Sequence, residues 1–224
     1  MAYLQVGVLT GLLVLVCGCA PAHRNPAASI TGFDAQQPGA LPDAWTAGAT
    51  NPQGPVANWA IAADPTAPTG PNVLALSSTN HSSSGTFNLC WMDRIPFRDG
   101  TIELAFKAVA GEEDQGGGPI WRVKDANNYY ICRANPLEGN FRLYFVKDGA
   151  RKQLASAKVE VTSGQWHQIK IAHIGTHIEC WLNGIKLLEA DDATIPESGG
   201  VGVWTKADAV TWFDDICIHN TTRQ

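Results

Sequence analysis

Residues 118–146 read GPIWRVKDANNYYICRANPLEGNFRLYFV. Two segments rich in Asn, Asp, Pro and Gly, residues 125–128 and 136–139, divide this stretch into three runs of alternating side chains. That pattern predicts three antiparallel strands joined by tight turns. With these turns, Trp121 lies opposite Cys132, and Cys132 lies opposite Leu143. Residues that face one another across two strands share a side of the sheet.

This register predicts a sheet with one apolar and one arginine-rich face. The core side then carries Trp121, Val123, Tyr130, Cys132, Ala134, Phe141, Leu143 and Phe145. The opposite face carries Arg122, Tyr129, Ile131, Arg133, Asn135, Arg142 and Tyr144. Guanidinium forks, an amide and aromatic rings suit a hydroxyl-rich or carboxylate-bearing ligand, so we expect a binding surface. The alternative is a solvated face covered by arginine stems, and a register slip of one residue would exchange the faces.

The bulk composition fits one domain with a sizeable core. The chain has 224 residues, of which 45% are hydrophobic and 17% charged, and its net charge is −5. No basic run provides the electrostatic footprint that nucleic-acid binding needs, so nucleic acid is not an expected partner. The chain has eight tryptophans, which serve either to fill a sandwich core or to stack on sugar rings.

The first 19 residues have the features of an export signal. The apolar run from Val6 to Val16 is too short to span a bilayer and lies where a signal peptide has its hydrophobic region. The sequence VCGC at 16–19 resembles a bacterial lipobox, which makes Cys19 the candidate lipidation site. An ordinary cleaved signal with incidental cysteines is the alternative. Residues 20–29 are small, polar or proline and predict a flexible tether, followed by one domain over 30–220.

Four further cysteines, Cys90, Cys132, Cys180 and Cys217, would enter an oxidising compartment after export. Four cysteines can pair in three ways, and the spacing does not select one. Buried free thiols are an equal alternative, because three of the four lie at apolar positions of alternating segments.

Turn residues and alternating patterns continue along most of the chain. Strands are expected near 59–62, 73–76, 86–91, 101–109, 153–161, 166–173, 177–182, 185–190, 201–204 and 210–219, in addition to the three above. No segment shows a sustained helical period with caps. The pattern predicts an all-β, two-sheet antiparallel jelly-roll sandwich.

Several motifs resemble one family of exported bacterial proteins. They are DANNYYICRAN at 125–135, VGVWTKADAVTWFDD at 201–215, FDAQQPGALP at 33–42 and GQWH at 164–167. The chain is similar in these segments to the 3-keto-disaccharide hydrolase domain family of the concanavalin A-like lectin/glucanase superfamily. The resemblance implies a jelly roll whose concave sheet meets carbohydrate. Some members cleave 3-keto-glycosides, and others only bind.

The carboxylates do not match the paired glutamates of a retaining glucanase. The strand TIELAFK at 101–107 carries Glu103 but no second acid on the same face. A 3-keto sugar needs only one base and a polarising group, because the ketone acidifies the neighbouring C–H. Glu103, Glu138 and Asp208 are the candidate bases, and the run Glu112 to Asp114 is expected to be a solvated loop.

The segment after Val203 supplies further candidates. Trp204, Lys206 and Asp208 point away from the core if Val201 and Val203 point into it, which places a ring, a cation and a carboxylate near one cleft. Burial of Trp204 is an equal alternative, and a turn at the surface is the alternative for residues 206–208. The run Phe213 to Ile216 breaks the alternation and predicts a bulge at Asp214 and Asp215. As in many relatives in the superfamily, these aspartates, with Asp34, are candidate ligands of a structural Ca²⁺; a hydrogen-bonded strand end is the alternative.

These observations lead to three hypotheses. The first is an exported, lipid-anchored, monomeric domain of the cell envelope that binds a glycan through Arg122, Tyr129, Arg133, Asn135, Arg142, Tyr144, Trp204 and Lys206, and meets the membrane only through its N-terminal lipid. The second is a 3-keto-glycoside hydrolase or lyase that uses the same cleft. The third is an envelope module that docks another protein.

Overall fold

The computed structural model describes residues 29–78 and 85–221, without the side chains of residues 29–31 and 78. The predicted leader, Cys19 and nearly all of the predicted tether lie outside the described residues. Fifteen strands run from Ser29 to Asn220. No described residue belongs to a helix of the length and apolar character that crossing a membrane requires.

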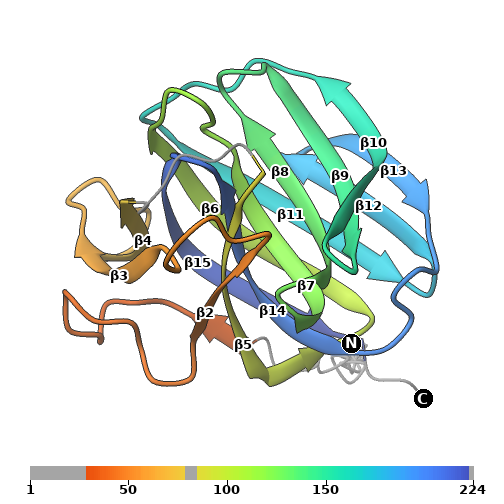
Figure 1. The fold of residues 1–224 in the computed structure, drawn as a ribbon, viewed down its shortest axis with the longest axis horizontal. Helices are drawn as coiled ribbons and strands as arrows, with labels where there is room; N and C mark the ends of the chain where they lie inside the picture. Colours follow the sequence, from red (N-terminus) through yellow and green to blue (C-terminus); the bar gives the residue numbers. More distant parts are fainter. Residues whose placement is uncertain (1–28, 79–84, 222–224) are drawn as a thin grey trace, which may run out of the picture.

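The strands form two antiparallel sheets packed face to face (Figure 1). The eight-stranded sheet contains β1 (Ser29–Thr31), β3 (Asn58–Ala63), β4 (Asn72–Ser78), β6 (Gly100–Ala110), β11 (Trp166–Ile174), β12 (His177–Leu182), β13 (Ile185–Asp191) and β15 (Val210–Asn220). The seven-stranded sheet contains β2 (Thr46–Thr50), β5 (Phe87–Phe97), β7 (Gly117–Asp125), β8 (Asn128–Asn135), β9 (Asn140–Lys147), β10 (Ala150–Lys158) and β14 (Gly199–Lys206). The predicted all-β sandwich is therefore confirmed.

Strand order explains how distant segments meet. The seven-stranded sheet runs β10-β9-β8-β7-β14-β5-β2, so β14, near the C-terminus, lies between β7 and β5. The other sheet runs β13-β12-β11-β6-β15-β4-β3, with β1 on β15. In Figure 1, strands β7 to β9 cross in front of β11 and β12, so the outer face of the seven-stranded sheet faces the viewer.

The apolar residues divide into two clusters. The larger cluster lies between the sheets and includes Trp121, Cys132, Phe141 and Val203, all fully buried. The smaller cluster lies on the outer face of the seven-stranded sheet, and its members are Phe87, Leu89, Trp91, Ile120, Val123, Tyr129, Ile131, Tyr144, Val146 and Trp204. Apolar side chains on both faces make this sheet a buried layer along much of its length.

The register between β8 and β9 is the predicted one. Cys132 pairs with Leu143 and Ala134 pairs with Phe141. Between β7 and β8, however, Trp121 pairs with Tyr130 and not with Cys132 as predicted, and the register shifts between Trp121 and Asp125. Arg122 there has a φ of 49°, a left-handed conformation that is uncommon for a residue with a side chain. The bulge exchanges the faces of Arg122 and Val123 relative to the prediction.

The four cysteines of the domain are free thiols. Cys90, Cys132 and Cys180 are buried in the inter-sheet core, and burial raises the pKa of the Cys90 and Cys132 thiols. Of the two alternatives, the structure therefore shows free thiols, three of them buried and Cys217 partly buried.

Candidate functional site

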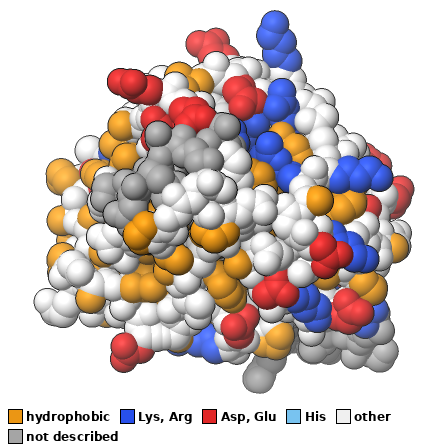
Figure 2. All heavy atoms as spheres, viewed as in Figure 1, with side chains coloured by type: hydrophobic (Ala, Val, Ile, Leu, Met, Phe, Trp, Pro, Cys, Tyr) orange, Lys and Arg blue, Asp and Glu red, His pale blue; other side chains and the backbone are white. Residues whose placement is uncertain are grey.

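Charged side chains gather on the outer face of the seven-stranded sheet, beside the smaller apolar cluster. Figure 2 shows Lys and Arg side chains next to hydrophobic ones towards the upper edge of this face. We call this group the charged site, and its members are Asp114, Arg133, Asn135, Glu138, Arg142, Tyr144, Arg151 and Lys206. They come from β8, β9, β10 and β14, from the loop before β7 and from the turn between β8 and β9.

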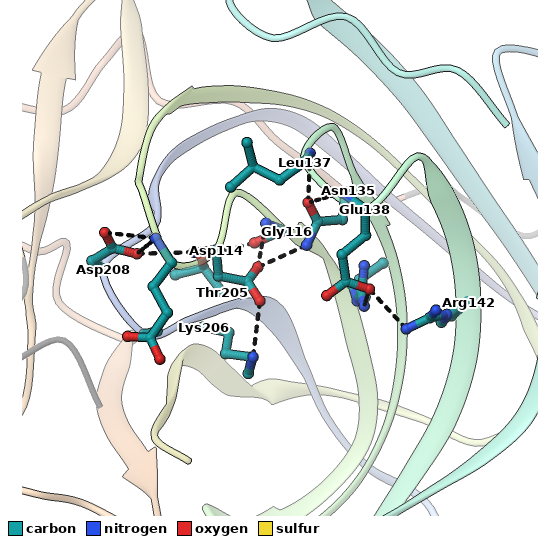
Figure 3. Close-up of polar contacts among 12 residues, drawn as sticks. Asp114, Gly116, Asn135, Leu137, Glu138, Arg142, Thr205, Lys206 and Asp208 are labelled. Atoms are coloured by element: carbon teal, nitrogen blue, oxygen red, sulfur yellow. Dashed lines mark hydrogen bonds and ion pairs between the residues drawn. The ribbon is translucent and has the colours of Figure 1, made fainter. Parts of the chain in front are cut away.

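Asp114 organises one end of the charged site (Figure 3). Its carboxylate accepts hydrogen bonds from the Gly116 amide at 2.6 Å, from Asn135 Nδ2 at 3.0 Å and from Lys206 Nζ at 3.0 Å. The Asp114 side chain is only 1% exposed, so the Lys206 ion pair is partly removed from water. The Asn135 side-chain oxygen accepts in turn from the Leu137 and Glu138 amides, which holds the β8–β9 turn in place.

Glu138 organises the other end. Its Oε2 accepts from Arg133 Nη2 at 2.9 Å, from Asn140 Nδ2 at 3.0 Å and from Arg142 Nη1 at 2.8 Å. Burial opposes ionisation of this carboxyl, but the hydrogen bonds from Asn140 and Arg133 and the charges of Arg133 and Arg142 lower its pKa to about 2. The side chains of Glu138 and Arg142 remain 37% and 31% exposed, so this end is open to a ligand.

Two guanidinium groups in the charged site keep unpartnered donors. Arg133 is 1% exposed and donates to Asn140, Glu138 and Tyr144, yet its Nε has no hydrogen-bond partner among the described residues. Arg151 lies 4.5 Å from the Tyr144 ring centroid and 4.7 Å from that of Phe87, and its buried Nη1 is equally unpartnered. Buried polar groups are normally hydrogen-bonded, so these donors mark a place where an acceptor is missing.

Trp204 and Tyr129 point to the predicted face but are buried in the smaller apolar cluster. Trp204 Nε1 donates to the Tyr129 hydroxyl at 3.2 Å, and that hydroxyl also bonds Thr50 at 2.8 Å. Val201 and Val203 point into the main core, as expected. Neither Trp204 nor Tyr129 is exposed, so a sugar could not stack on either ring. Both side chains instead pack beneath the charged site.

Arg122 is not part of the charged site, which corrects the predicted set. Its side chain lies at one end of the sandwich, 1% exposed, where it donates to the carbonyls of Arg98 at 2.9 Å, Ile195 at 2.8 Å and Gly175 at 3.1 Å. It also pairs with Asp99 at 3.4 Å. The predicted sharing of a face by Arg122 and Arg133 is therefore wrong, because the bulge in β7 turns Arg122 towards these carbonyls.

The three candidate bases lie in different parts of the structure and have different partners. Glu103 lies on the outer face of the other sheet, where it pairs with Lys170 at 2.8 Å, and is not brought to the charged site. The Asp208 carboxylate accepts from the backbone amides of residues 112–114 at 2.7 to 3.1 Å, and these hydrogen bonds lower its pKa against the opposing effect of burial. Of the three candidate bases, only Glu138 forms ion pairs with arginines of the charged site.

The calcium candidates converge around the segment after β3. Asp215 has a φ of 52° within a register shift of β15, which is the predicted bulge. Asp215 accepts from the Thr69 hydroxyl, Asp214 from the Thr69 amide, and Asp34 from the Asn72 amide. Asp214 Oδ1 is buried without a partner among the described residues, and burial, with the charges of Asp215 and Asp34, raises the pKa of Asp214 to about 6. An orphaned carboxylate oxygen beside two further acids fits the oxygen chemistry that Ca²⁺ prefers.

A different group of described residues has the spacing of metal ligands. The group consists of His177, Glu179 and Glu189, whose potential ligand atoms all lie within 4.8 Å of one another. They are exposed or half-buried, and Lys186 already forms ion pairs with both glutamates. The three aspartates do not form such a compact group.

Sequence reasoning missed two members of the charged site. Asp114 was expected in a solvated loop, but Lys206 and Asn135, distant in sequence, bury it. Arg151 lies outside the strand predicted at 153–161, but the observed β10 begins at Ala150 and includes it. Arg151 pairs with Val146, which shares a face with Tyr144, so the alternation continued by one strand would have placed it there.

Three solved structures share this fold at low sequence identity. The carbohydrate binding module CBM66 from Bacillus subtilis has a TM-score of 0.59 at 18% identity and covers 77% of this chain and 93% of its own. A mixed-linkage glucan GH16 from Bacteroides ovatus, in complex with its product, has a TM-score of 0.61 at 12% identity and covers 85% and 99%. Domain 4 of a GH43 arabinanase from Geobacillus stearothermophilus, in complex with arabinotriose, has a TM-score of 0.52 at 12% identity and covers 88% and 84%.

These likenesses show the jelly-roll fold of carbohydrate-binding and glycoside hydrolase domains. No curated protein matches the sequence. A family model, described as the 3-keto-alpha-glucoside-1,2-lyase-like domain, matches residues 33–219, which is most of the chain. The chain therefore belongs to the family of 3-keto-alpha-glucoside-1,2-lyase-like domains.

Proposed function

We propose that this domain binds a carbohydrate at the charged site. The observation that carries the proposal is the half-open pair of Glu138 and Arg142 beside the half-buried Arg151, whose guanidinium has no hydrogen bond or ion pair among the described residues. Sugar hydroxyls both donate and accept, so they can pair with free N–H groups and with a carboxylate oxygen at once. In the described residues, Glu138 Oε1 has no recorded hydrogen bond and is available as an acceptor.

The state of the carboxylates favours binding over proton abstraction by these groups. A general base works best with a pKa near the operating pH. The pKa of Glu138 is lowered to about 2, and that of Asp208 is also lowered. Glu103 lies on the other sheet. Neither Glu138 nor Asp208 is therefore suited to accept a proton at neutral pH, whereas an ionised Glu138 is well suited to accept hydrogen bonds from a sugar.

A glycan array followed by calorimetry tests the proposal. Arg142→Met is the informative variant, because Arg142 is 31% exposed and its loss leaves the buried Arg133–Glu138 pair in place. Lys170→Met is the matched control, since it removes a half-exposed cation of similar burial from the outer face of the opposite sheet. We expect binding that falls about tenfold in Arg142→Met and is unchanged in Lys170→Met. Equal binding by both variants would move the ligand away from the charged site.

A second candidate function follows from the family description. In a 3-keto-glycoside, a base removes the proton on C2, which the neighbouring ketone acidifies. The electron pair forms a C1=C2 double bond as the C1–O bond breaks, and the departing oxygen takes up a proton, which releases the second sugar. Incubation with a 3-keto-disaccharide, with product release followed by chromatography, tests this reaction. Turnover by the wild type would establish catalysis, and its loss in Glu138→Gln with binding retained would assign the base to Glu138. Turnover that persists in Glu138→Gln would mean that another residue is the base. Binding without turnover by the wild type would favour the hypothesis that the domain only binds carbohydrate.

We also propose export and lipid anchoring at Cys19, supported by the apolar run at 6–16 and the lipobox-like VCGC. Metabolic labelling with a fatty-acid analogue should mark the wild type and not Cys19→Ser. The third hypothesis, docking of another protein, is favoured if the array returns no glycan and affinity capture returns a single partner.

A further inference from the structure

The charged site has donors left over, whereas its acceptors are largely used. The Asp114 carboxylate already accepts from three groups, and Glu138 Oε2 accepts from three more. On the donor side, Arg133 Nε and Arg151 Nη1 have no partner among the described residues. Glu138 Oε1 is still free to accept, but the half-buried guanidinium of Arg151 has no acceptor among the described residues, so it favours a ligand that brings one.

Arg151 adds a charge that no ion pair among the described residues neutralises. The ion pairs described within the charged site join Arg133 and Arg142 to Glu138 and Lys206 to Asp114, and none of them includes Arg151. Its guanidinium instead lies against the rings of Tyr144, Phe87 and Trp204. Ring faces attract a cation weakly, and they do not replace the water or the anion that a partly buried guanidinium loses.

Arg133 reinforces the same requirement. Its guanidinium carbon lies 5.9 Å from the Tyr144 ring centroid and that of Arg151 lies 4.5 Å from it, so two guanidinium groups share one ring. Burial and the nearby charge of Arg133 both lower the pKa of Arg151. A negative group bound beside Tyr144 would relieve this repulsion.

We propose that the ligand of the charged site is an acidic glycan, and that Arg151 binds the carboxylate of a uronic acid residue. The proposal rests on the proposed carbohydrate-binding function and adds the class of sugar. A carboxylate is planar and accepts the two parallel N–H bonds that a guanidinium offers, which a neutral sugar hydroxyl cannot do. In this arrangement the half-exposed Arg142 and Glu138 form hydrogen bonds with hydroxyl groups of the same oligosaccharide.

The test compares acidic oligosaccharides with their carboxyl-reduced counterparts. Fragments of galacturonan, alginate and glucuronoxylan are each paired with the same oligosaccharide after reduction of the carboxylate to an alcohol. Neutral and sulfated glycans complete the panel. We expect at least one acidic fragment to bind, with the reduced counterpart weaker by about tenfold or more, because a charge-assisted hydrogen bond is lost.

Arg151 variants locate the preference. Arg151→Met should remove the difference between acidic and reduced fragments, and Arg151→Lys, which keeps the charge but loses the fork, should weaken only the acidic fragment. Lys152→Met is the control, because Lys152 is the next residue of β10, is exposed and lies near Phe145. If Arg151→Met does not fold, the Arg151→Lys comparison decides alone.

The outcomes separate the two proposals. Equal binding of acidic and reduced fragments, binding of neutral glycans only, or a preference for sulfated glycans would overturn the uronic acid assignment and leave carbohydrate binding intact. An unchanged preference in both Arg151 variants would also overturn it. Absence of binding across the whole panel would remove the proposed function itself.

Discussion

Replacing Arg122 by Met should destabilise the fold without touching the charged site. Arg122 fastens three segments at one end of the sandwich: the β5–β6 turn through Arg98 and Asp99, the β11–β12 turn through Gly175, and the segment before β14 through Ile195. Methionine keeps much of the apolar stem but removes every one of these hydrogen bonds, together with the guanidinium that lies 5.8 Å from the Tyr130 ring centroid.

The magnitude follows from the contacts that are lost. Hydrogen bonds to a charged group contribute roughly 1.5 to 3 kcal/mol each, and three carbonyls lose such a donor. The buried cation is removed with its own desolvation cost, which offsets a large part of that sum. Asp99 keeps its hydrogen bond from the Gly175 amide, so its charge is not left alone. We expect the free energy of unfolding to fall by about 3 kcal/mol.

Urea unfolding followed by tryptophan fluorescence measures this change. With a slope of about 2 kcal/mol per M, the midpoint should fall by about 1.5 M. Arg98→Met is the matched control, because Arg98 is a 46% exposed arginine 3.9 Å from the same Asp99; its effect should stay within about 0.5 kcal/mol. An Arg122→Met protein as stable as wild type but deficient in glycan binding would refute the reasoning and return Arg122 to the ligand surface.

Three further predictions concern other parts of the molecule. Burial and the nearby charge of Arg122 lower the pKa of His173 in the folded protein to about 3. In the unfolded chain the pKa of this histidine is about 6.5, so the unfolded chain binds more protons below pH 6.5. The free energy of unfolding should therefore fall by up to about 1.4 kcal/mol per pH unit as the pH is lowered from 6.5 to 4.5. His173→Gln, which can still accept from Trp121 Nε1, should flatten this slope in urea titrations at several pH values. Asp208→Ala leaves the amides of residues 112–114 without their acceptor, so their hydrogen exchange should accelerate and stability should drop by about 1 to 3 kcal/mol; unchanged exchange would contradict the anchoring role. Ca²⁺ should raise Tm in wild type and in Glu189→Gln but not in Asp214→Asn, and an equal response in all three would exclude the Asp214 site.

Much of the seven-stranded sheet could be predicted because its signals are local. The turn at 136–139 and the alternation on both sides place Cys132 opposite Leu143, and this pairing is observed. The same alternation puts Arg133, Asn135, Arg142 and Tyr144 on one face. A strand repeats every two residues, so recognised turns are enough to assign faces over neighbouring strands.

The bulge in β7 could not be predicted in this way. Arg122 has a left-handed backbone conformation, which glycine or asparagine at this position would have indicated in the sequence but arginine does not. Its reason lies in carbonyls at positions 98, 175 and 195, which only the assembled sandwich brings together. The burial of Asp114 has the same origin, since β14 carries Lys206 to it across 92 residues of sequence.

The sequence by itself determined the sandwich, most of its strands and the parity of β8 and β9, because alternation and turn chemistry act over a few residues. The tertiary structure alone decided which polar groups meet: it took Arg122 and Glu103 out of the site, brought Asp114 and Arg151 into it, and buried Trp204. Hydrogen bonds and ion pairs between distant strands depend on strand order and on bulges such as that in β7, and the local sequence pattern revealed neither, although it did predict the bulge in β15.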